Sequence, residues 1–383
     1  MRIVCDENMA ITPMLRAAAT SLTTKPGRAI VREDLLHADA LLVRSVTPVT
    51  ATLLENTTIQ FVGTATAGID HIDQQALQQL GIGFACAAGA NANAVSEWVL
   101  GVLAYTGALR ALLAGGVLGI VGFGHVGQRL HCVAKRLGIE TLIYDPWFES
   151  GDKAGFTQDL RQIVDCTAVS LHAALHDRAP WPSRDLLKGV QIPVGANGRW
   201  LINAARGALL SVTTCNRFMD AGWQLCLDTW PEEPVISSEL LSAVRTASAH
   251  IAGYSKPAKI RATNELVTRM QRALDIQECA GQDHHVQPLV SPESANNRPY
   301  EGDATAWLEQ LLIDTSRINR DDRELRALGG NGISATTFDQ LRKSYPARNE
   351  LAGTLLTLPT RLETLTKWCD ALEIRWLVGN SST

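Results

Sequence analysis

Three residues near the middle of the chain, Arg206, Glu233 and His250, have side chains that could carry out an acid–base reaction. Histidine exchanges its proton near neutral pH, so His250 could accept or donate a proton. A guanidinium offers two parallel donors that match a carboxylate, and a glutamate paired with a histidine favours the protonated ring. Together they supply what oxidation of a 2-hydroxy acid needs: Arg206 holds the substrate carboxylate, His250 accepts the hydroxyl proton, and Glu233 stabilises the imidazolium.

Each of the three residues also has an interpretation without function. Arg206 taken alone could be a surface arginine, Glu233 an acid in the turn before Pro234, and His250 a core histidine with satisfied hydrogen bonds. Their positions after predicted strands favour the functional interpretation, which depends on the elements around them.

Four short apolar runs are predicted as buried parallel strands: Ala168–His172, Trp200–Ala204, Gln224–Leu227 and Thr246–Ala249. Arg206 follows the second of these strands, Asp228 ends the third, and His250 ends the fourth. The carboxyl ends of parallel strands share one edge of a sheet, where ligands bind. The pattern therefore predicts that these side chains meet at one edge.

A glycine-rich turn before these strands predicts a dinucleotide site. It joins a predicted strand at Val117–Val121 to a helix that begins near Val126 and ends at Gly138. The three glycines of G-x-G-x-x-G permit a tight turn, a close approach of a pyrophosphate, and close packing of helix on strand, while the helix start faces the anion. The predicted cofactor loop consists of Gly122, Gly124, His125, Val126 and Gly127.

Asp145 completes the predicted cofactor site. It ends the next predicted strand, Thr141–Tyr144. Its carboxylate can accept hydrogen bonds from an adenosine ribose and would repel a 2′-phosphate, which favours NAD over NADP.

The first 90 or so residues predict a second parallel sheet with helices on both faces. Its predicted strands are Arg2–Cys5, Ala40–Val43, Phe61–Gly63 and Ile82–Cys86, and its predicted helices are Met9–Thr20 and Gln74–Leu80. Arg44 follows one of these strands and is the best-placed cation of this unit for a substrate phosphate. Its strand ends are therefore candidates for binding something other than the cofactor.

The remaining chain predicts connecting helices and a small third unit. Asn91–Leu113 reads as one long buried helix, Pro257–Ile276 as a helix that crosses back to the first unit, and 280–304 as a linker in which His284 and His285 are solvated. In the third unit the predicted helices are Ala306–Asp314, Phe338–Lys343 and Thr360–Leu372, with a charged polar stretch at Arg317–Arg326. Packing or dimerisation suits a unit of this size.

We therefore expect an α/β protein with two doubly wound parallel-sheet (Rossmann/flavodoxin-like) domains and a small C-terminal α+β domain. The expected boundaries are 1–92 with 255–280 for substrate binding, 93–254 for NAD binding, and 281–383 for dimerisation.

Composition narrows the class of protein. The 383 residues include 46% hydrophobic and 19% charged residues, with a net charge of −4, so nucleic acid is not an expected partner. The eight cysteines show no metal-binding spacing, which favours free thiols in a reducing compartment. The first residues do not resemble a signal peptide and no run is long enough to span a membrane. We expect a cytoplasmic protein without a bound metal.

The order of these motifs resembles the D-2-hydroxyacid dehydrogenases. After the glycine loop come Asn-x-x-Arg-Gly at 203–207, Asp-x-Trp-x-x-Glu-Pro at 228–234 and His-x-x-Gly at 250–253. A narrower resemblance is to the branch of this family that oxidises 4-phospho-D-erythronate. It rests on five stretches: Arg2–Met9, Ala38–Thr47, Phe61–Asp73, Ser248–Tyr254 and Phe338–Tyr345.

The resemblance implies roles for individual residues. It implies that Arg206, Glu233 and His250 are catalytic, that Ser45, Thr66 and Tyr254 contact substrate, and that Asp145, Asp228 and Gly253 contact NAD. It also implies 2-oxo-3-hydroxy-4-phosphobutanoate as product, in vitamin B6 (pyridoxal 5′-phosphate) biosynthesis, and a homodimer formed through the C-terminal domain.

The sequence departs from the family pattern in several places, among them His125 in the glycine loop and the turn before Val117. Relatives commonly have His-Thr-Pro where this chain has His172, Ala173 and Ala174, so Ala173 lacks one hydroxyl contact to NAD. The segment 180–198 also matches poorly.

Three alternatives stay open at this stage. One is another family member such as a 3-phosphoglycerate dehydrogenase, and another is a non-catalytic NAD(H)-sensing protein. The third concerns Arg342, Lys343 and Arg348, which form either a basic cluster that reaches a partner's active site or a solvated helix face.

Overall fold

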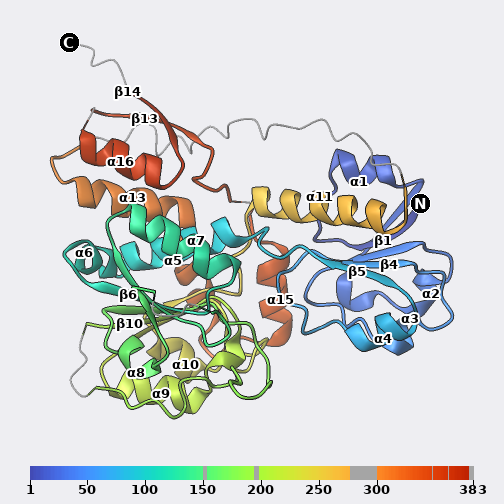
Figure 1. Ribbon diagram of the computed structural model, residues 1–383, viewed down its shortest axis with the longest axis horizontal. Coiled ribbons are helices and arrows are strands. Elements are labelled where there is room, and N and C mark those ends of the chain that lie inside the picture. Colours follow the sequence, from blue (N-terminus) through green and yellow to red (C-terminus); the bar gives the residue numbers. More distant parts are fainter. Residues whose placement is uncertain (150–152, 194–197, 277–299, 347, 361, 379–383) are drawn as a thin grey trace. The chain divides into compact units, whose positions relative to one another are not determined.

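The computed structural model describes residues 1–149, 153–193, 198–276, 300–346, 348–360 and 362–378, which form two compact units (Figure 1). One unit combines residues 1–91 with the helix that begins after Ser255. The other combines residues 92–254 with the C-terminal elements. The described C-terminal elements thus group with the second sheet. Their expected status as a separate domain, with the boundaries given above, stays a prediction.

The first unit contains a five-stranded parallel sheet in the order β2-β1-β3-β4-β5. The strands are β1 (Arg2–Asp6), β2 (Ser21–Lys25), β3 (Ala40–Val43), β4 (Phe61–Thr64) and β5 (Gly83–Cys86). Both faces of β3 are buried, as expected for a strand covered by helices on both sides. The parallel sheet predicted from the sequence is confirmed.

Helices cover both faces of this sheet, with one apolar cluster on each side. In Figure 1, α1 (Pro13–Ala18) and α11 (Lys256–Ala273) lie on one face, and α2 (Arg32–Leu35), α3 (Ala51–Leu54) and α4 (Gln74–Gln79) lie on the other. The prediction that a helix near Pro257 crosses back to the first unit is confirmed by α11, which packs on β4 and β5.

The second unit contains a seven-stranded parallel sheet in the order β12-β11-β10-β9-β6-β7-β8. The strands are β6 (Val117–Val121), β7 (Glu140–Tyr144), β8 (Phe156–Thr157), β9 (Ala168–Leu171), β10 (Trp200–Asn203), β11 (Gln224–Leu227) and β12 (Thr246–Ala247). Chain order reverses at β6, between β7 and β9. Such a switch point places the loops after β6 and β9 beside each other, which is where open α/β sheets bind ligands.

Helices cover both faces of the second sheet (Figure 1). One side carries α5 (Ala92–Tyr105), α6 (Ala108–Leu113), α7 (His125–Arg136), α13 (Ala304–Ser316) and α16 (Glu363–Ala371). The other carries α8 (Leu160–Ile163), α9 (Val212–Asp220), α10 (Ser238–Ala243) and α15 (Ala335–Lys343), while α14 (Ile318–Leu328) packs along the edge strand β12 and also contacts α5 and α13. A parallel pair, β13 (Leu355–Leu358) and β14 (Arg375–Val378), completes the described elements.

One prediction about helices is wrong, and one stretch to which no secondary structure was assigned is a helix. The single helix expected at Asn91–Leu113 is broken at Gly107, where a left-handed φ of 81° separates α5 from α6. The charged, polar stretch at Arg317–Arg326 forms the helix α14, in which Asp322 and Arg326 are paired one turn apart at 3.0 Å. The linker predicted at 280–304, with His284 and His285, lies mostly outside the described residues.

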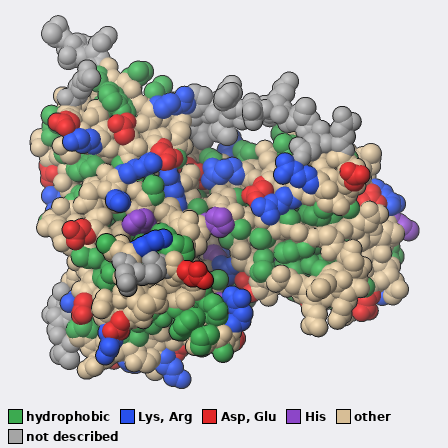
Figure 2. Space-filling model, viewed as in Figure 1, with side chains coloured by type: hydrophobic (Ala, Val, Ile, Leu, Met, Phe, Trp, Pro, Cys, Tyr) green, Lys and Arg blue, Asp and Glu red, His purple; other side chains and the backbone are tan. Residues whose placement is uncertain are grey.

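The surface agrees with the near-neutral composition. Figure 2 shows Lys and Arg side chains interspersed with Asp and Glu over the face it presents. Among the described helices, none is both long and apolar enough to cross a membrane.

Candidate active site

His250 and Glu233 form a close pair in the second unit. The ring Nδ1 of His250 lies 2.5 Å from Oε1 of Glu233, and about a quarter of the imidazole remains exposed. Burial alone raises the pKa of the Glu233 carboxyl, but the charge and hydrogen bond of His250, with Arg342 and the Trp230 amide, hold that pKa below its usual value. A carboxylate on Nδ1 leaves Nε2 as the nitrogen that can exchange a proton with a ligand.

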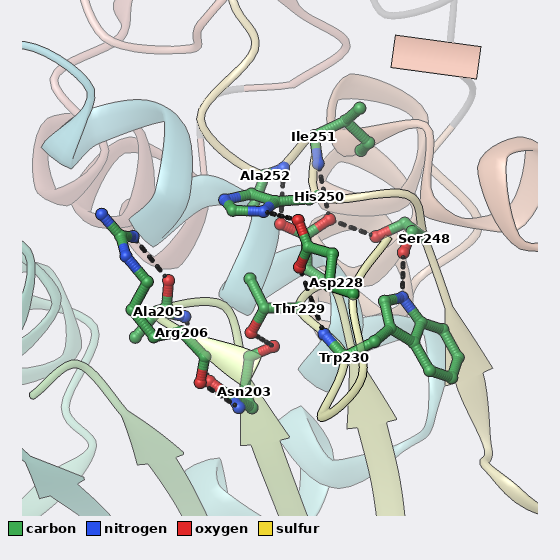
Figure 3. Close-up of polar contacts among 11 residues, drawn as sticks. Asn203, Ala205, Arg206, Asp228, Thr229, Trp230, Ser248, His250, Ile251 and Ala252 are labelled. Atoms are coloured by element: carbon green, nitrogen blue, oxygen red, sulfur yellow. Dashed lines mark hydrogen bonds and ion pairs between the residues drawn. The ribbon is translucent and has the colours of Figure 1, made fainter. Parts of the chain in front are cut away.

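The backbone of the His250 loop is fixed by Asp228, at the end of β11. Its carboxylate is buried and accepts hydrogen bonds from Ser248 Oγ at 2.6 Å, from the Ile251 amide at 2.7 Å and from the Ala252 amide at 3.0 Å (Figure 3). The His250 amide in turn donates to the Asp228 carbonyl at 2.7 Å. Asp228 therefore positions the loop after β12, a role that the sequence motif did not reveal; its contact with NAD stays a prediction.

Arg206 stands on a turn that follows β10. Asn203, the last residue of that strand, accepts from the Ala205 amide at 3.1 Å and donates to the Arg206 carbonyl at 2.9 Å. A Cβ on Gly207 would lie 1.7 Å from the Trp230 carbonyl oxygen, so only glycine lets this turn contact the loop after β11. Figure 3 shows Arg206 and His250 projecting beyond the carboxyl ends of the strands, as the sequence predicts.

The glycine loop has the shape that the motif predicts. Gly122 has a φ of 94°, and a Cβ there would lie 2.5 Å from the Ala173 amide nitrogen, so the loops after β6 and β9 touch. A Cβ on Gly127 would lie 2.1 Å from the Gly122 carbonyl oxygen, whereas Gly124 faces open space. Gly122 and Gly127 are closely packed, and the space beside Gly124 is open. This arrangement suits a loop that binds the pyrophosphate of a dinucleotide.

The residues around this loop take the expected places, and their contacts with a cofactor stay predictions. Asp145 Oδ2 accepts from the Phe123 amide at 2.7 Å and Oδ1 from the Trp147 amide at 2.9 Å, so the carboxylate borders the glycine turn. His125 begins α7 and is exposed, and Val126 is half-buried beside it.

The substrate residues predicted in the first unit also come together there. Arg44 and Ser45 directly follow β3, and Thr66 follows the neighbouring strand β4. Because the last residues of these strands, Val43 and Thr64, are paired in register, the two segments begin side by side. Arg44 is buried, with one guanidinium nitrogen 3.4 Å from the Asn8 carbonyl oxygen. Thr66 Oγ1 donates to the Gly68 carbonyl at 2.8 Å. These positions form a polar edge at the carboxyl ends of two adjacent strands.

Tyr254 and Gly253 follow the histidine loop in the second unit. The Tyr254 amide donates to the Ile251 carbonyl at 2.7 Å, which closes a turn over Gly253. The Tyr254 ring lies edge-on to Tyr345, with centroids 6.2 Å apart. The predicted substrate residue Tyr254 is thus packed against the C-terminal part of the chain.

The basic cluster after Phe338 is not a solvated helix face. Arg342 and Arg348 are buried, and only Lys343 of the three is exposed. Arg342 lies over the Tyr254 ring of its own chain, 5.5 Å from the centroid. The sequence did not predict this position, because only tertiary packing brings α15 beside the loop after β12.

His172, the histidine of the divergent His-Ala-Ala stretch, is not available for acid–base chemistry. Its Nε2 lies 2.9 Å from Ser170 Oγ, and burial lowers the pKa of its ring to about 3. Within the described ranges, no group of three His, Cys, Asp or Glu side chains is arranged to hold a metal ion.

Comparisons with known proteins agree with this geometry. The model of the D-isomer specific 2-hydroxyacid dehydrogenase catalytic domain matches residues 4–282. The erythronate-4-phosphate dehydrogenase of Cellvibrio japonicus is 34% identical over 98% of this chain and 100% of the relative. The enzyme of the same name from Serratia proteamaculans is 37% identical over 91% and 93%.

Solved structures share the fold at lower identity. An NAD+-bound 3-phosphoglycerate dehydrogenase from Entamoeba histolytica is 19% identical, with a TM-score of 0.58, over 74% of this chain and 99% of that one. A glyoxylate reductase from Paecilomyes thermophila is also 19% identical, with a TM-score of 0.57, over 72% and 96%. On the family match and the full-length relatives, the chain belongs to the D-isomer-specific 2-hydroxyacid dehydrogenase family.

Proposed function

We propose that this protein oxidises 4-phospho-D-erythronate to 2-oxo-3-hydroxy-4-phosphobutanoate, with NAD as the hydride acceptor. In this role it serves an early step of pyridoxal 5′-phosphate synthesis. The relatives that match nearly the whole chain carry the name of this reaction. The observation that supports the chemistry most directly is the 2.5 Å contact between His250 and Glu233.

The residues of the chain provide the proton transfer and the binding of the reacting group. Glu233 orients the imidazole through Nδ1, so Nε2 accepts the proton of the C2 hydroxyl as the C2–H bond breaks. Glu233, held ionised, stabilises the imidazolium that results. Arg206 binds the substrate carboxylate and polarises the C2 oxygen as it becomes a carbonyl.

NAD, when bound, accepts the hydride that leaves C2. Gly122, Gly124 and Gly127 would hold its pyrophosphate at the start of α7, and Asp145 would accept hydrogen bonds from its ribose. Further cofactor contacts are proposed for His125, Val126, Ala173, Asp228 and Gly253. Ser45, Thr66 and Tyr254 would bind the substrate, and Arg44 supplies a cation for its phosphate.

A homodimer formed through residues 281–383 and a cytoplasmic location complete the proposal. Light scattering of the purified chain gives the mass of the particle in solution. A particle of twice the mass of the chain supports the homodimer, and a particle of one chain mass contradicts it.

The absorbance of NADH tests the proposed reaction. Purified protein with NAD+ should show rising NADH absorbance when 4-phosphoerythronate is added. A non-catalytic NAD(H)-sensing protein would bind NADH, as measured by fluorescence, and form none from this substrate. That result would replace the proposed activity by a sensing function, which the intact Arg206, Glu233 and His250 set disfavours.

A further inference from the structure

Arg342 is a buried cation that the reaction proposed above does not use. It lies near the end of α15, one turn after Phe338, so both side chains lie on one face of the helix. Phe338 is fully buried in an apolar cluster of the second unit, and the Arg342 guanidinium lies 5.7 Å from the centre of its ring. The same guanidinium lies 5.5 Å from the centre of the Tyr254 ring. Packing of α15 thus directs Arg342 toward the loop that carries His250.

The groups that interact with Arg342 belong largely to the active site. Burial alone lowers the pKa of Arg342, but Tyr254, Glu233, Asp228 and Asp339 together raise it. Three of these four lie on the loops after β11 and β12. Glu233 in turn interacts with His250 and Arg342 as its charged neighbours. A buried cation therefore accompanies the carboxylate that orients the imidazole.

A second arginine of the same stretch fixes the loop itself. Arg348 donates from one guanidinium nitrogen to the Ala252 carbonyl and, at 2.9 Å, to the Ala94 carbonyl at the start of α5. The amide of Ala252 donates to Asp228. The residues from α15 to Arg348 thus contact the histidine loop both by charge and by hydrogen bonds. This part of the chain is built into the active site of its own subunit.

We propose that Arg342 is a positioning residue for the Glu233–His250 pair, whose buried charge keeps Glu233 ionised so that it holds the imidazole with Nε2 open to the substrate. This inference rests on the proposed function and gives a role to a residue of the stretch Phe338–Tyr345, to which the resemblance itself assigns none. A positive charge beside the pair opposes uptake of a further proton. Removing it makes protonation easier, so the pair takes up a proton at higher pH.

Loss of the Arg342 charge should change the pH dependence of kcat/KM in one direction only. Oxidation of the hydroxy acid needs an unprotonated imidazole, so the acidic limb of the kcat/KM profile should move to higher pH in Arg342→Met. At an effective dielectric constant of about 20, the loss of one neighbouring unit charge corresponds to a shift on the order of one pH unit. On the acidic limb, well below both midpoints, kcat/KM should fall about tenfold, and the loss should disappear at pH values above them. A merely structural defect would lower kcat/KM equally at every pH.

Three variants of the full-length protein separate charge from packing. Arg342→Lys keeps the charge and should keep the acidic limb within a few tenths of a pH unit of wild type. Lys343→Met removes the same charge from an exposed position of the same helix and should leave the profile unchanged. If Arg342→Met does not fold, Arg342→Gln takes its place with the same expected shift. An unshifted limb in the folded neutral variant, or an equal shift in Lys343→Met, would overturn the proposal.

An activity-independent readout keeps this test distinct from the proposed function. Histidine ring signals in nuclear magnetic resonance, assigned by the loss of a signal in a His250 variant, report proton uptake by the pair in each protein. A rise of about one pH unit in the neutral Arg342 variant supports the role of the cation, even if 4-phosphoerythronate is not turned over. An unchanged midpoint rejects it, even if the wild type is active.

Discussion

The Asp228 carboxylate accepts a hydrogen bond of 2.7 Å from the amide of Ile251, the residue directly after His250. An acid at the end of β11 therefore fixes the backbone on which the histidine after β12 stands. His250 keeps a left-handed φ of 55° in this loop. Such a conformation costs a non-glycine residue about 1–2 kcal/mol, and the hydrogen bonds to Asp228 offset this cost.

Asp228→Asn should weaken this loop. An amide cannot accept at both oxygen positions, so one of the hydrogen bonds from Ser248, Ile251 and Ala252 would become a contact between two donors. We expect a loss of about 1–3 kcal/mol in the free energy of unfolding and a lower kcat. Urea unfolding and initial rates measure both. Asp220→Asn, the same change at an exposed position, is the control, and equal stability of the two variants would contradict the assigned role.

The fold and the place of the candidate residues at one edge of the sheet followed from the sequence because both depend on local patterns. Short apolar runs before Arg206 and His250 predicted parallel strands, and parallel strands place their carboxyl ends at one edge. The glycine loop was predictable because its close backbone contacts leave no room for a side chain, as the surroundings of Gly122 and Gly127 show. Neither inference needed knowledge of distant packing.

What the sequence did not reveal depends on tertiary contacts. Strand β2 (Ser21–Lys25) has one apolar residue among four polar ones, lies at the edge of its sheet and has little buried surface to mark it. The helix α14 is stabilised by pairing of its charges and by a hydrogen bond from the Ala247 amide to Asp322, at 2.8 Å. Arg342 reaches the active site only because Phe338 anchors α15 in the core. Neither the Ala247–Asp322 hydrogen bond nor the place of Arg342 leaves a periodic pattern in the sequence, whereas the ion pairs of α14 have the i,i+4 spacing of a helix.

Replacement of His250 should abolish turnover and spare cofactor binding. Asparagine is the preferred substitute because it tolerates the left-handed backbone at this position. Loss of the general base should lower kcat by about 10²–10⁴, while the affinity for NADH, measured by fluorescence, stays close to that of wild type. Rates within about twofold of wild type would refute the assigned proton transfer.

Gly207→Ala should displace the Arg206 turn. A Cβ at this position would lie 1.7 Å from the Trp230 carbonyl oxygen, which is backbone and cannot rotate away. We expect a large loss of kcat/KM and a lower melting temperature. Gly189→Ala is the matched control, because a Cβ there meets nothing within 4 Å. Full activity in both alanine variants would show that the close approach of Gly207 to the Trp230 carbonyl is not needed for catalysis.

Stability should depend on pH through His172. Its pKa is lowered from 6.5 to about 3 by burial, so between these values the unfolded chain binds a proton that the folded protein does not. The free energy of unfolding therefore falls as pH falls from about 6.5, by up to about 1.4 kcal/mol per pH unit from this group. The difference in stability between wild type and His172→Gln should shrink over this range. A difference that is independent of pH would exclude this effect.

The most direct test of the proposed activity is a comparison of kcat/KM for 4-phosphoerythronate and for 3-phosphoglycerate, with NAD+ in both assays. The second substrate represents the family member whose fold this chain shares at 19% identity. We predict that 4-phosphoerythronate is preferred by at least about tenfold, a difference of about 1.4 kcal/mol in transition-state binding. An equal or higher value for 3-phosphoglycerate would contradict the proposed substrate.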